Sequence, residues 1–408
     1  MIVAKRKYHP PNGFSRFPSR SSLCWLILCR LLTGCGTPPP AATSTLIASE
    51  HYALRAVTLV QGLVEPWSLA FLPDGELLVT ERPGRLRRVV GGALQPEPVA
   101  GLPDIIASGQ GGLLDVALHP DFAANRLVYL SYVARAAEGV GTEVARGRLD
   151  GNTLTGLQVI FRATPKLPGN AHFGSRLLFA PDGNLLITLG ERYTEREQAQ
   201  NLANHLGKII RLKDDGSIPA DNPFIGHSGA RPEIYSYGHR NVQGIAQQPG
   251  TGKVWAHEHG PQGGDELNLL QAGSNYGWPV ITYGRNYVTG TQIGEGTEKP
   301  GMAQPVHYWV PSIAPSGFAF YAGEPFARWQ GNALIGSLAF DQLVRLEIVD
   351  GRVVHEERLL DGRFARIRDV RIGPDGLPYL LAGGDAGRIV RLEPAALMGT
   401  AGNGAGTR

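Results

Sequence analysis

Residues 70–79 read Ala70-Phe71-Leu72-Pro73-Asp74-Gly75-Glu76-Leu77-Leu78-Val79 and place a tight turn between two short apolar segments. In such a turn proline presets φ, the aspartate side chain bonds back to the backbone, and glycine supplies a positive φ. The flanking segments are short and lie directly against the turn, so the pattern predicts a β-hairpin.

The same pattern recurs along the chain. Four further copies have their turns at Pro120-Asp121, Pro181-Asp182-Gly183, Pro249-Gly250 and Pro374-Asp375-Gly376. The prolines of the five turns are 47, 61, 68 and 125 residues apart, and a degenerate copy at Gly323-Glu324-Pro325 fills the longest gap. Six units of roughly 50–70 residues indicate radial or solenoid repetition. Period-2 segments favour an all-β fold, a six-bladed β-propeller over residues 55–395, with one short helix at residues 198–206.

The composition supports a large folded body. The chain has 408 residues, 42% of them hydrophobic, and its 54 Gly and 30 Pro are spread throughout, which favours short strands joined by turns over disorder. No long uncharged apolar run occurs after residue 50, so no transmembrane segment is expected in the body. Six basic residues and no acidic one lie in the first 34 residues, which leaves 33 basic against 36 acidic residues elsewhere. A nucleic-acid-binding surface is therefore not expected.

The N-terminal segment has the features of a secretory signal. The three cysteines are Cys24, Cys29 and Cys35, so the body can form no disulfide and has no catalytic thiol. An apolar stretch at residues 23–32 follows a basic segment, and Leu32-Thr33-Gly34-Cys35 is similar to a bacterial lipoprotein box. We expect residues 1–34 to be a lipoprotein-type signal peptide and Cys35 to be lipidated. A plain cleaved signal or a disordered tail is the alternative.

Flexible segments are expected at both ends of the body. Residues 35–54 are rich in Pro, Ala and Thr, which is typical of a tether, and residues 396–408 form a Gly-rich tail. Together with the signal, the tether predicts an exported, periplasmic protein. It would touch a membrane only through a lipid anchor in the bacterial outer membrane.

Polar residues gather in the loops between the predicted hairpins. Arg240, Arg366 and Arg368 carry forked cations that can each bind a planar carboxylate through two hydrogen bonds. Gln110 and Asn241 can donate to carbonyl oxygens. Each has an ordinary explanation when taken singly, such as a surface ion-pair ladder for the arginines. Their occurrence together in loops of successive repeats favours a binding site at one mouth of the propeller.

Two further groups suggest chemistry. His172 can act as a base, with Glu191 orienting it and stabilising its protonated form. Glu266, with exposed carbonyls near Gly260 and Pro261, forms an oxygen-rich set suited to calcium. A structural histidine and an ordinary loop are the plainer explanations. The chain has no Gly-x-Gly-x-x-Gly after a first strand, no Walker loop and no His-Glu-x-x-His motif, so nucleotide and zincin chemistry lack their signatures.

The loops together resemble those of a known family. They carry, in order, Gly109-Gln110-Gly111-Gly112, Asn170-Ala171-His172-Phe173-Gly174, Tyr237-Gly238-His239-Arg240-Asn241-Val242-Gln243-Gly244, His259-Gly260-Pro261, Gly264-Asp265-Glu266-Leu267-Asn268, Asn275-Tyr276-Gly277-Trp278-Pro279, Ser312-Ile313-Ala314-Pro315-Ser316-Gly317 and Arg366-Ile367-Arg368-Asp369. These motifs are similar to those of the soluble pyrroloquinoline-quinone (PQQ)-dependent glucose/sorbosone dehydrogenases, and most similar to the aldose sugar dehydrogenase branch. The resemblance covers residues 55–395. It implies a six-bladed propeller, in agreement with the repeat count.

The resemblance implies a role for each matching residue. His172 corresponds to the catalytic base and Glu191 to its carboxylate partner. The residues that match quinone-binding side chains are Gln110, His172, Arg240, Asn241, Tyr287, Arg366 and Arg368. The carbonyls of Gly260 and Pro261 match ligands of a calcium ion that bridges to the quinone. Glu266 and the carbonyl of Tyr276 match a second, structural calcium site.

One position departs from the family pattern. Ala339 lies where a cofactor-facing lysine is usual, so one positive charge toward the quinone is missing. Because Arg240, Arg366 and Arg368 remain to offset the three cofactor carboxylates, weaker quinone binding is expected rather than lost function.

The function implied by the resemblance is oxidation of aldose sugars at the anomeric carbon to lactones, with PQQ and Ca²⁺ as cofactors and an unidentified electron acceptor. His172 would take the anomeric hydroxyl proton while hydride passes to the quinone. The alternatives are a calcium-dependent propeller lactonase or esterase, and a non-catalytic cell-surface binding propeller. Neither alternative needs three cations around a tricarboxylate, so the arginines favour the dehydrogenase.

Overall fold

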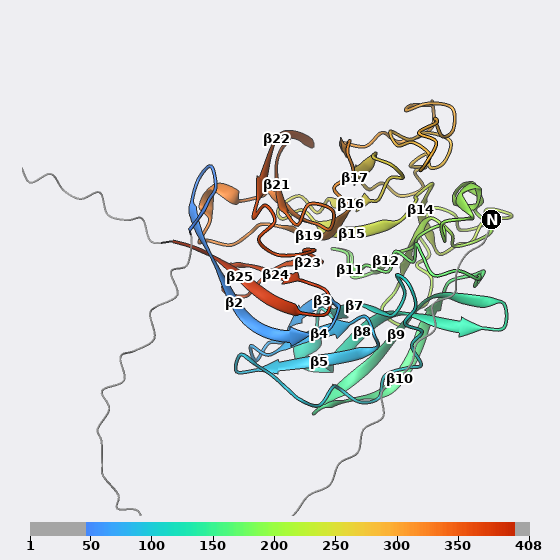
Figure 1. The fold of residues 1–408 in the computed structure, drawn as a ribbon. Coiled ribbons are helices and arrows are strands. Elements are labelled where there is room, and N and C mark those ends of the chain that lie inside the picture. The colour runs from blue at the N-terminus through green and yellow to red at the C-terminus, as the bar shows by residue number, and fades with distance from the viewer. Residues whose placement is uncertain (1–45, 396–408) are drawn as a thin grey trace, which may run out of the picture. The chain divides into compact units, whose positions relative to one another are not determined.

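The computed structural model describes residues 46–395, and the account below is limited to them. The chain forms six antiparallel sheets, of which five have four strands and one has five (Figure 1). The first strands of neighbouring sheets contact one another around a central axis. The predicted all-β, six-bladed propeller is therefore confirmed. The expected signal peptide at residues 1–34, Cys35 and the tail at residues 396–408 lie outside the described residues.

Each of the first five blades consists of four consecutive strands. Blades one to three contain β3 (Pro66–Phe71), β4 (Leu77–Glu81), β5 (Arg85–Val90) and β6 (Ala93–Leu94); β7 (Leu113–Leu118), β8 (Leu127–Ala136), β9 (Gly139–Asp150) and β10 (Thr153–Arg162); and β11 (Leu177–Phe179), β12 (Leu185–Thr188), β13 (Lys208–Leu212) and β14 (Ile234–Tyr237). Blades four and five contain β15 (Val242–Gln247), β16 (Val254–Glu258), β17 (Asp265–Leu269) and β18 (His307–Trp309); and β19 (Pro315–Phe320), β20 (Ala333–Ser337), β21 (Leu343–Val349) and β22 (Arg352–Leu359). The helical turns are α1 (Phe122–Asn125), η1 (Arg196–Gln200) and η2 (Ala327–Trp329).

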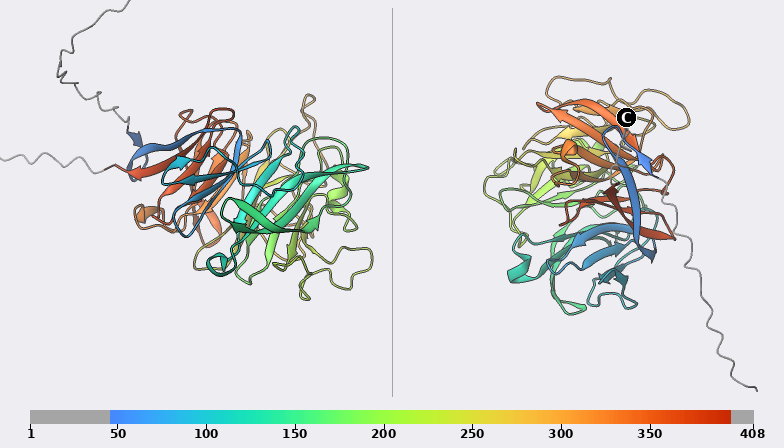
Figure 2. Two further views of the ribbon diagram at one scale, coloured as in Figure 1. Left: turned by 90° about the horizontal axis from the view of Figure 1, so that it is seen from below. Right: turned by 90° about the vertical axis from the view of Figure 1, so that its left-hand side faces the viewer.

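The sixth blade joins the two ends of the propeller. It consists of β23 (Asp369–Ile372), β24 (Pro378–Ala382) and β25 (Gly387–Pro394), to which β2 (Ala53–Leu63) and β1 (Ile47–Ala48) are added. Figure 2 shows the N-terminal strands in blue beside the C-terminal strand in red. Residues 47–54, part of the segment expected to be a tether, therefore belong to the propeller. Ile47 and Ala48 pair with Leu54 and Ala53, and Leu54 pairs in turn with Pro394 at the other end of the chain, so local composition does not reveal that this segment joins the sheet.

The predicted turns all join the first strand of a blade to the second. The turns at residues 73–75, 181–183 and 374–376 connect β3 to β4, β11 to β12 and β23 to β24. Those at residues 120–121, 249–250 and 323–325 hold the corresponding places in the other three blades. The loops that precede each first strand and follow each second strand therefore gather at the opposite mouth of the propeller. This mouth carries the candidate site.

Apolar side chains pack between neighbouring sheets and make the loop-bearing frame rigid. Between the fourth and fifth blades, Trp255, Trp309, Phe318 and Phe320 form one such buried cluster. Each large apolar side chain removed from water contributes about 1.5–3 kcal/mol. The loops at the mouth are thus anchored on strands that packing holds in place.

The expected helix at residues 198–206 is wrong in extent, because the structure has only the short turn η1 there. The buried ammonium group of Lys208 explains the difference. Its Nζ donates to the carbonyls of Gln198 (3.0 Å), Ala199 (2.9 Å) and Leu206 (2.6 Å), which turns these carbonyls away from a helical ladder. Burial lowers the pKa of Lys208 to about 7. This lysine ties the segment between β12 and β13 to the sheet.

Candidate active site

A histidine and a glutamate form a buried pair at the mouth. His172 precedes β11 and Glu191 follows β12, so two loops of the same blade bring them together. His172 Nδ1 lies 2.7 Å from Glu191 Oε2, and the residues are 5% and 1% exposed. Because a carboxylate can only accept, Nδ1 carries the proton and Nε2 keeps its lone pair. Burial lowers the pKa of His172, although the Glu191 carboxylate opposes this shift. The ring is therefore neutral near pH 7 and able to accept a proton at Nε2.

A neighbouring loop holds the backbone of His172. The amide N–H of His172 donates to Gln110 Oε1 at 2.8 Å, and the N–H of Gln110 donates to the carbonyl of Asn170 at 2.8 Å. Gly109 makes this approach feasible, because a Cβ there would lie 2.5 Å from the Asn170 side chain and its φ is +58°. Gln110 thus orients the loop that carries the base.

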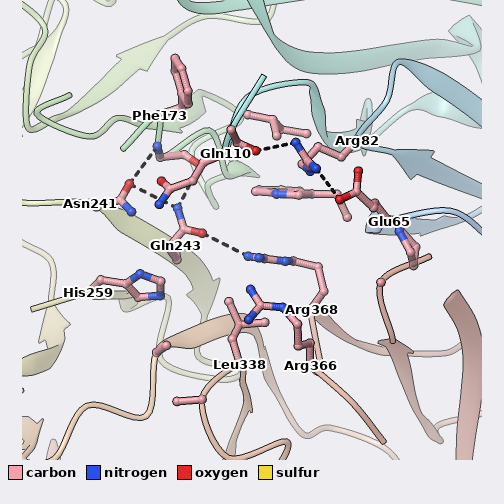
Figure 3. A pocket seen from close by; sticks show the side chains of 18 of the residues that line it. Glu65, Arg82, Gln110, Phe173, Asn241, Gln243, His259, Leu338, Arg366 and Arg368 are labelled. Atoms are coloured by element: carbon pink, nitrogen blue, oxygen red, sulfur yellow. Dashed lines mark hydrogen bonds and ion pairs between the residues drawn. The ribbon is translucent and has the colours of Figure 1, made fainter. Parts of the chain in front are cut away.

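A cavity of about 560 Å³ is lined by Gln110 and by Phe173 and Gly174, the two residues that follow His172 (Figure 3). Four of the residues expected to bind the quinone line it: Gln110, Asn241, Arg366 and Arg368. Its volume is in the range of about 300–1,000 Å³ that small-molecule sites occupy. Ala339, the position of the missing lysine, lies in the same wall.

The cavity has an excess of positive charge. Among residues 46–395, no carboxylate lies within 4.0 Å of the guanidinium groups of Arg366 or Arg368. Burial and, after it, the nearby guanidinium groups of Arg366, Arg176 and Arg82 together lower the pKa of Arg368 to about 9. Cations that repel one another in a concave site favour an anionic ligand.

A chain of side-chain amides links Arg368 to Asn241 (Figure 3). Arg368 Nη1 donates to Gln243 Oε1 at 3.3 Å, and Gln243 Nε2 donates to Asn241 Oδ1 at 3.3 Å. Asn241 Oδ1 also accepts from the N–H of Gly174 at 3.1 Å, so its Nδ2 is left to donate to a ligand. Gln243 was not among the expected site residues. A two-residue period could have found it, because Asn241, directly before β15, and Gln243, the second residue of β15, both line the cavity.

The sequence also gave no indication of Arg82, which lines the cavity from the end of β4. Its Nη1 donates to the carbonyls of Gly109 (2.5 Å) and Gly111 (3.1 Å), and the guanidinium forms an ion pair with Glu65. Arg82 therefore both holds the loop of Gln110 and brings a third guanidinium group to the cavity. No motif marks it, since it follows an ordinary strand.

Below the cavity, Arg176 joins the inner strands. Its guanidinium lies over Trp67 at 4.1 Å and pairs with Asp369 Oδ1 at 2.9 Å. It also donates to the backbone carbonyls of Gln243 (2.9 Å) and Arg368 (3.0 Å). Gln243 and Arg368, which both line the cavity, thus contact the same buried guanidinium group of Arg176, and this contact fixes their relative position.

Arg240 and Tyr287 line a second cavity of about 390 Å³ instead of the first. Arg240 Nη1 donates to the carbonyl of Gly260 at 2.7 Å, and the Tyr287 hydroxyl donates to the carbonyl of Pro261 at 3.1 Å. The structure therefore brings both carbonyls expected to bind calcium into contact with two of the expected quinone-binding side chains. Glu191, the partner of His172, also lines this second cavity, so the cavity lies next to the candidate base.

An oxygen-rich group lies at the expected structural calcium site. Asn268 Nδ2 donates to both Glu258 (3.3 Å) and Glu266 (3.4 Å), while Asn268 Oδ1 is buried without a partner among the described residues. Burial and the neighbouring Glu258 carboxylate raise the pKa of Glu266 well above its usual value. Two carboxylates, of which Glu258 also contacts His239 Nδ1 at 2.8 Å, and an amide oxygen without a partner are suited to a hard cation.

Tyr276, expected to supply a carbonyl there, is anchored by its ring. Its hydroxyl donates to the carbonyl of Leu269 at 2.8 Å, and the ring stacks on His239 with centroids 4.6 Å apart. Within residues 46–395 no three His, Cys, Asp or Glu side chains form a metal-binding cluster. Any metal here would therefore rely on backbone and amide oxygens as well.

Comparisons with known proteins identify the family of this chain. The model of the Glucose / Sorbosone dehydrogenase family matches residues 63–391. The aldose sugar dehydrogenase YliI of Escherichia coli is 47% identical over 362 residues, which cover 87% of this chain and 97% of that protein. Quinoprotein glucose dehydrogenase B of Acinetobacter calcoaceticus is 30% identical over 321 residues, which cover 71% of this chain and 64% of that protein.

Solved structures show the same fold. The apo-form of the soluble aldose sugar dehydrogenase from Escherichia coli has a TM-score of 0.81 at 45% identity and covers 84% of this chain and 100% of that chain. The PQQ-bound form of an aldose sugar dehydrogenase from Streptomyces coelicolor has a TM-score of 0.68 at 31% identity and covers 83% of this chain and 98% of that chain.

Proposed function

Because the chain belongs to the glucose/sorbosone dehydrogenase family, we propose that it is an aldose sugar dehydrogenase that uses PQQ and calcium and oxidises the anomeric carbon to a lactone. One observation carries this proposal. A cavity contains two guanidinium groups that form no ion pair within residues 46–395, Arg366 and Arg368, and its wall includes Phe173 and Gly174, which directly follow the His172 that pairs with Glu191. Such an oxidation needs a cation-rich site that binds the quinone and a positioned base that removes the substrate proton.

The first cavity suits a planar tricarboxylate. Arg366, Arg368 and Arg82 would hold carboxylates, since a guanidinium group can form two parallel hydrogen bonds to one carboxylate. Asn241 would donate its free Nδ2 to a ring carbonyl. Arg240 Nε, buried without a partner among residues 46–395, would supply a further donor from the side of the second cavity. When bound, PQQ supplies a two-electron acceptor for the hydride that leaves the anomeric carbon.

The protein's own contribution to the chemical step is proton removal. His172 Nε2 would accept the proton of the anomeric hydroxyl, because Nδ1 is engaged with Glu191. Glu191 would keep the ring in this tautomer and stabilise the imidazolium that forms. A positioned base of this kind contributes roughly 10²–10⁴-fold to the rate.

Calcium is assigned to the carbonyls of Gly260 and Pro261 and, in a second site, to Glu266 and the carbonyl of Tyr276. Support for the second site comes from the unpartnered Asn268 Oδ1 and the raised pKa of Glu266, both of which a divalent cation would relieve. A cation at the first pair of carbonyls would lie beside Arg240 and Tyr287, at the edge of the second cavity. There it would draw electron density from a bound carbonyl group.

The location of the protein is also a proposal. Among the described residues, no helix is long and apolar enough to cross a membrane. We assign the protein to the periplasm, with a lipid on Cys35 as its anchor, on the basis of the leader sequence. Cys35→Ser should release the protein from membranes or block its processing. A mature N-terminus at another residue, found by mass spectrometry, would contradict the anchor.

Reconstitution tests the proposed function. Purified protein depleted of cofactor and metal is assayed for dye reduction with an aldose, with PQQ and Ca²⁺ added separately and together. We expect activity only when both are present. Activity without PQQ, or hydrolysis of a lactone without any dye reduction, would overturn the proposal and favour the lactonase.

A further inference from the structure

A strained turn lies directly after Glu191. Arg192 and Tyr193 have φ values of 67° and 70°, the left-handed region that residues with a Cβ rarely adopt. Two such residues in succession persist only where the surroundings hold them, and such strain concentrates at ligand-binding positions. The turn therefore points to a side chain that has to lie in one particular place.

Arg192 holds this turn against the loop of His172. Its guanidinium donates to the carbonyls of Ala171 (3.0 Å), Val140 (2.5 Å) and Gly169 (2.9 Å). The same group lies over the Phe173 ring at 4.2 Å. Arg192 is only 5% exposed, so all of these contacts are sheltered from water. The loop before the base and the turn after its partner thus form one unit.

Tyr193 is the outward-facing residue of this unit. Its ring meets the His172 ring edge-on, with centroids 5.1 Å apart and an interplanar angle of 87°. It nevertheless remains 52% exposed and lines the 390 Å³ cavity together with Glu191 and Trp278. An aromatic ring that is half in water, next to a buried base, has no packing role on its exposed side.

The cavity combines aromatic and polar walls. Tyr193, Trp278 and Tyr287 supply ring faces, and Thr194 and Asn286 supply hydroxyl and amide groups. A sugar ring has apolar C–H faces and a rim of hydroxyl groups, so it matches walls of both kinds. A carboxylate-rich ligand would instead favour the first cavity, because in the second cavity the cations Arg196 and Arg240 are balanced by Glu191 and Glu197.

We propose that Tyr193 is a substrate-binding residue whose exposed ring face packs against the aldose and places its anomeric hydroxyl at His172. This inference rests on the proposed function and adds a residue to it. Tyr193 lies two residues after Glu191 in the same turn. The proposed sugar-binding residue and the partner of the base are therefore held by one segment.

Two variants separate the ring from the backbone. Tyr193→Asn removes the ring but suits a left-handed backbone, since Asn tolerates positive φ better than other residues with a Cβ. Tyr193→Phe keeps the ring. Val354→Asn is the matched control, because Val354 is 58% exposed on β22 and lines neither cavity.

Steady-state kinetics with PQQ, Ca²⁺ and glucose, together with fluorescence titration of PQQ, give the first readouts. For Tyr193→Asn we expect KM to rise about five- to tenfold, the size of one aromatic contact, while kcat and the Kd for PQQ change less than about twofold. Tyr193→Phe, which keeps the ring, should have a KM closer to that of the wild type than Tyr193→Asn has, and Val354→Asn should match the wild type. An unchanged KM in Tyr193→Asn would overturn the inference, and so would a fall in kcat alone, which would indicate that the ring only shields His172.

Saturation-transfer NMR of glucose on the PQQ-free, Ca²⁺-loaded protein distinguishes the two proposals. Transfer to glucose in the wild type, together with its loss in Tyr193→Asn, would support Tyr193 as a sugar-binding residue. This conclusion would hold even if PQQ is never reduced, and in that case only the proposed function fails. Equal transfer in the two proteins contradicts this role of Tyr193 while leaving the dehydrogenase intact.

Discussion

His172 Nδ1 and Glu191 Oε2 lie 2.7 Å apart in a pair that is almost completely buried. The contact decides which nitrogen can act as a base, because the carboxylate keeps the proton on Nδ1 and leaves the lone pair on Nε2. It also sets the balance of the histidine's pKa, which burial lowers and the carboxylate raises. Both consequences can be measured.

The first prediction concerns pH. A base works only when neutral, so activity is lost as pH falls through the pKa of His172, which lies below its usual value of 6.5. Glu191→Gln removes the group that raises this pKa, so the acid limb of kcat/KM should move to still lower pH. The rate should also fall, though less than in His172→Ala. An acid limb that stays in place or moves upward would contradict the pairing.

The second prediction concerns retention of the cofactor. Arg366→Ala removes a guanidinium without a protein carboxylate, so the Kd for PQQ should rise about ten- to a hundredfold. Arg82→Gln should raise it less, about three- to tenfold, because Glu65 already offsets part of the Arg82 charge. Ala339→Lys should lower it by restoring a cation to the wall.

Equilibrium dialysis of PQQ measures these constants directly. Arg55→Gln is the matched control, because Arg55 pairs with Glu393 and lines neither cavity. If Arg82→Gln and Arg55→Gln bind PQQ equally, Arg82 only holds the loop of Gln110. If Ala339→Lys binds PQQ more weakly than the wild type, the cavity does not receive the carboxylates.

The third prediction concerns calcium. A ligand that binds only the folded state increases the free energy of unfolding, by about 2.7 kcal/mol at a hundred times its Kd, and so raises the melting temperature. Calcium should therefore raise the Tm of the wild type, and Glu266→Gln should reduce this rise because one carboxylate is lost. Glu295→Gln, at an exposed ion pair with Lys299, should respond as the wild type does. Identical melting curves with calcium and with chelator would remove the metal from this site.

The fourth prediction concerns Lys208, whose pKa is lowered to about 7 by burial. Between pH 7 and its ordinary value near 10.5 the unfolded chain keeps this proton and the folded protein does not. The unfolded state therefore binds more protons, and stability rises with pH over this window by at most about 1.4 kcal/mol per unit. Lys208→Met should remove that slope in urea unfolding at pH 7 to 9. Parallel pH profiles for the two proteins would show that the ammonium group is not buried as described.

The sequence predicted the architecture because each blade carries a local signal. The turns at Pro73 and Pro181 depend on three or four consecutive residues, so their repetition reveals the blade count without long-range information. The first strand of the closing sheet has no such signal. Ile47 is buried in an apolar cluster with Phe326 and Trp329, because its strand β1 pairs with β2, which pairs with β25 at the other end of the chain.

The candidate site was predictable from the sequence where the residue types themselves indicate a chemical role. The sequence brought together His172 and Glu191, which the structure places in contact. It could not show that Arg240 and Asn241, consecutive in the chain, line different cavities, because both lie in the loop before β15, whose path is set by folding. Arg82 was missed because its contribution arises from folding alone.

The central claim is that His172 removes the substrate proton in a quinone-dependent oxidation. Its most direct test is stopped-flow measurement of cofactor reduction by an aldose in protein reconstituted with PQQ and Ca²⁺, comparing His172→Ala with the wild type. The account predicts that reduction slows by roughly 10²–10⁴-fold in His172→Ala while the Kd for PQQ changes little. Reduction at the wild-type rate in His172→Ala would contradict it.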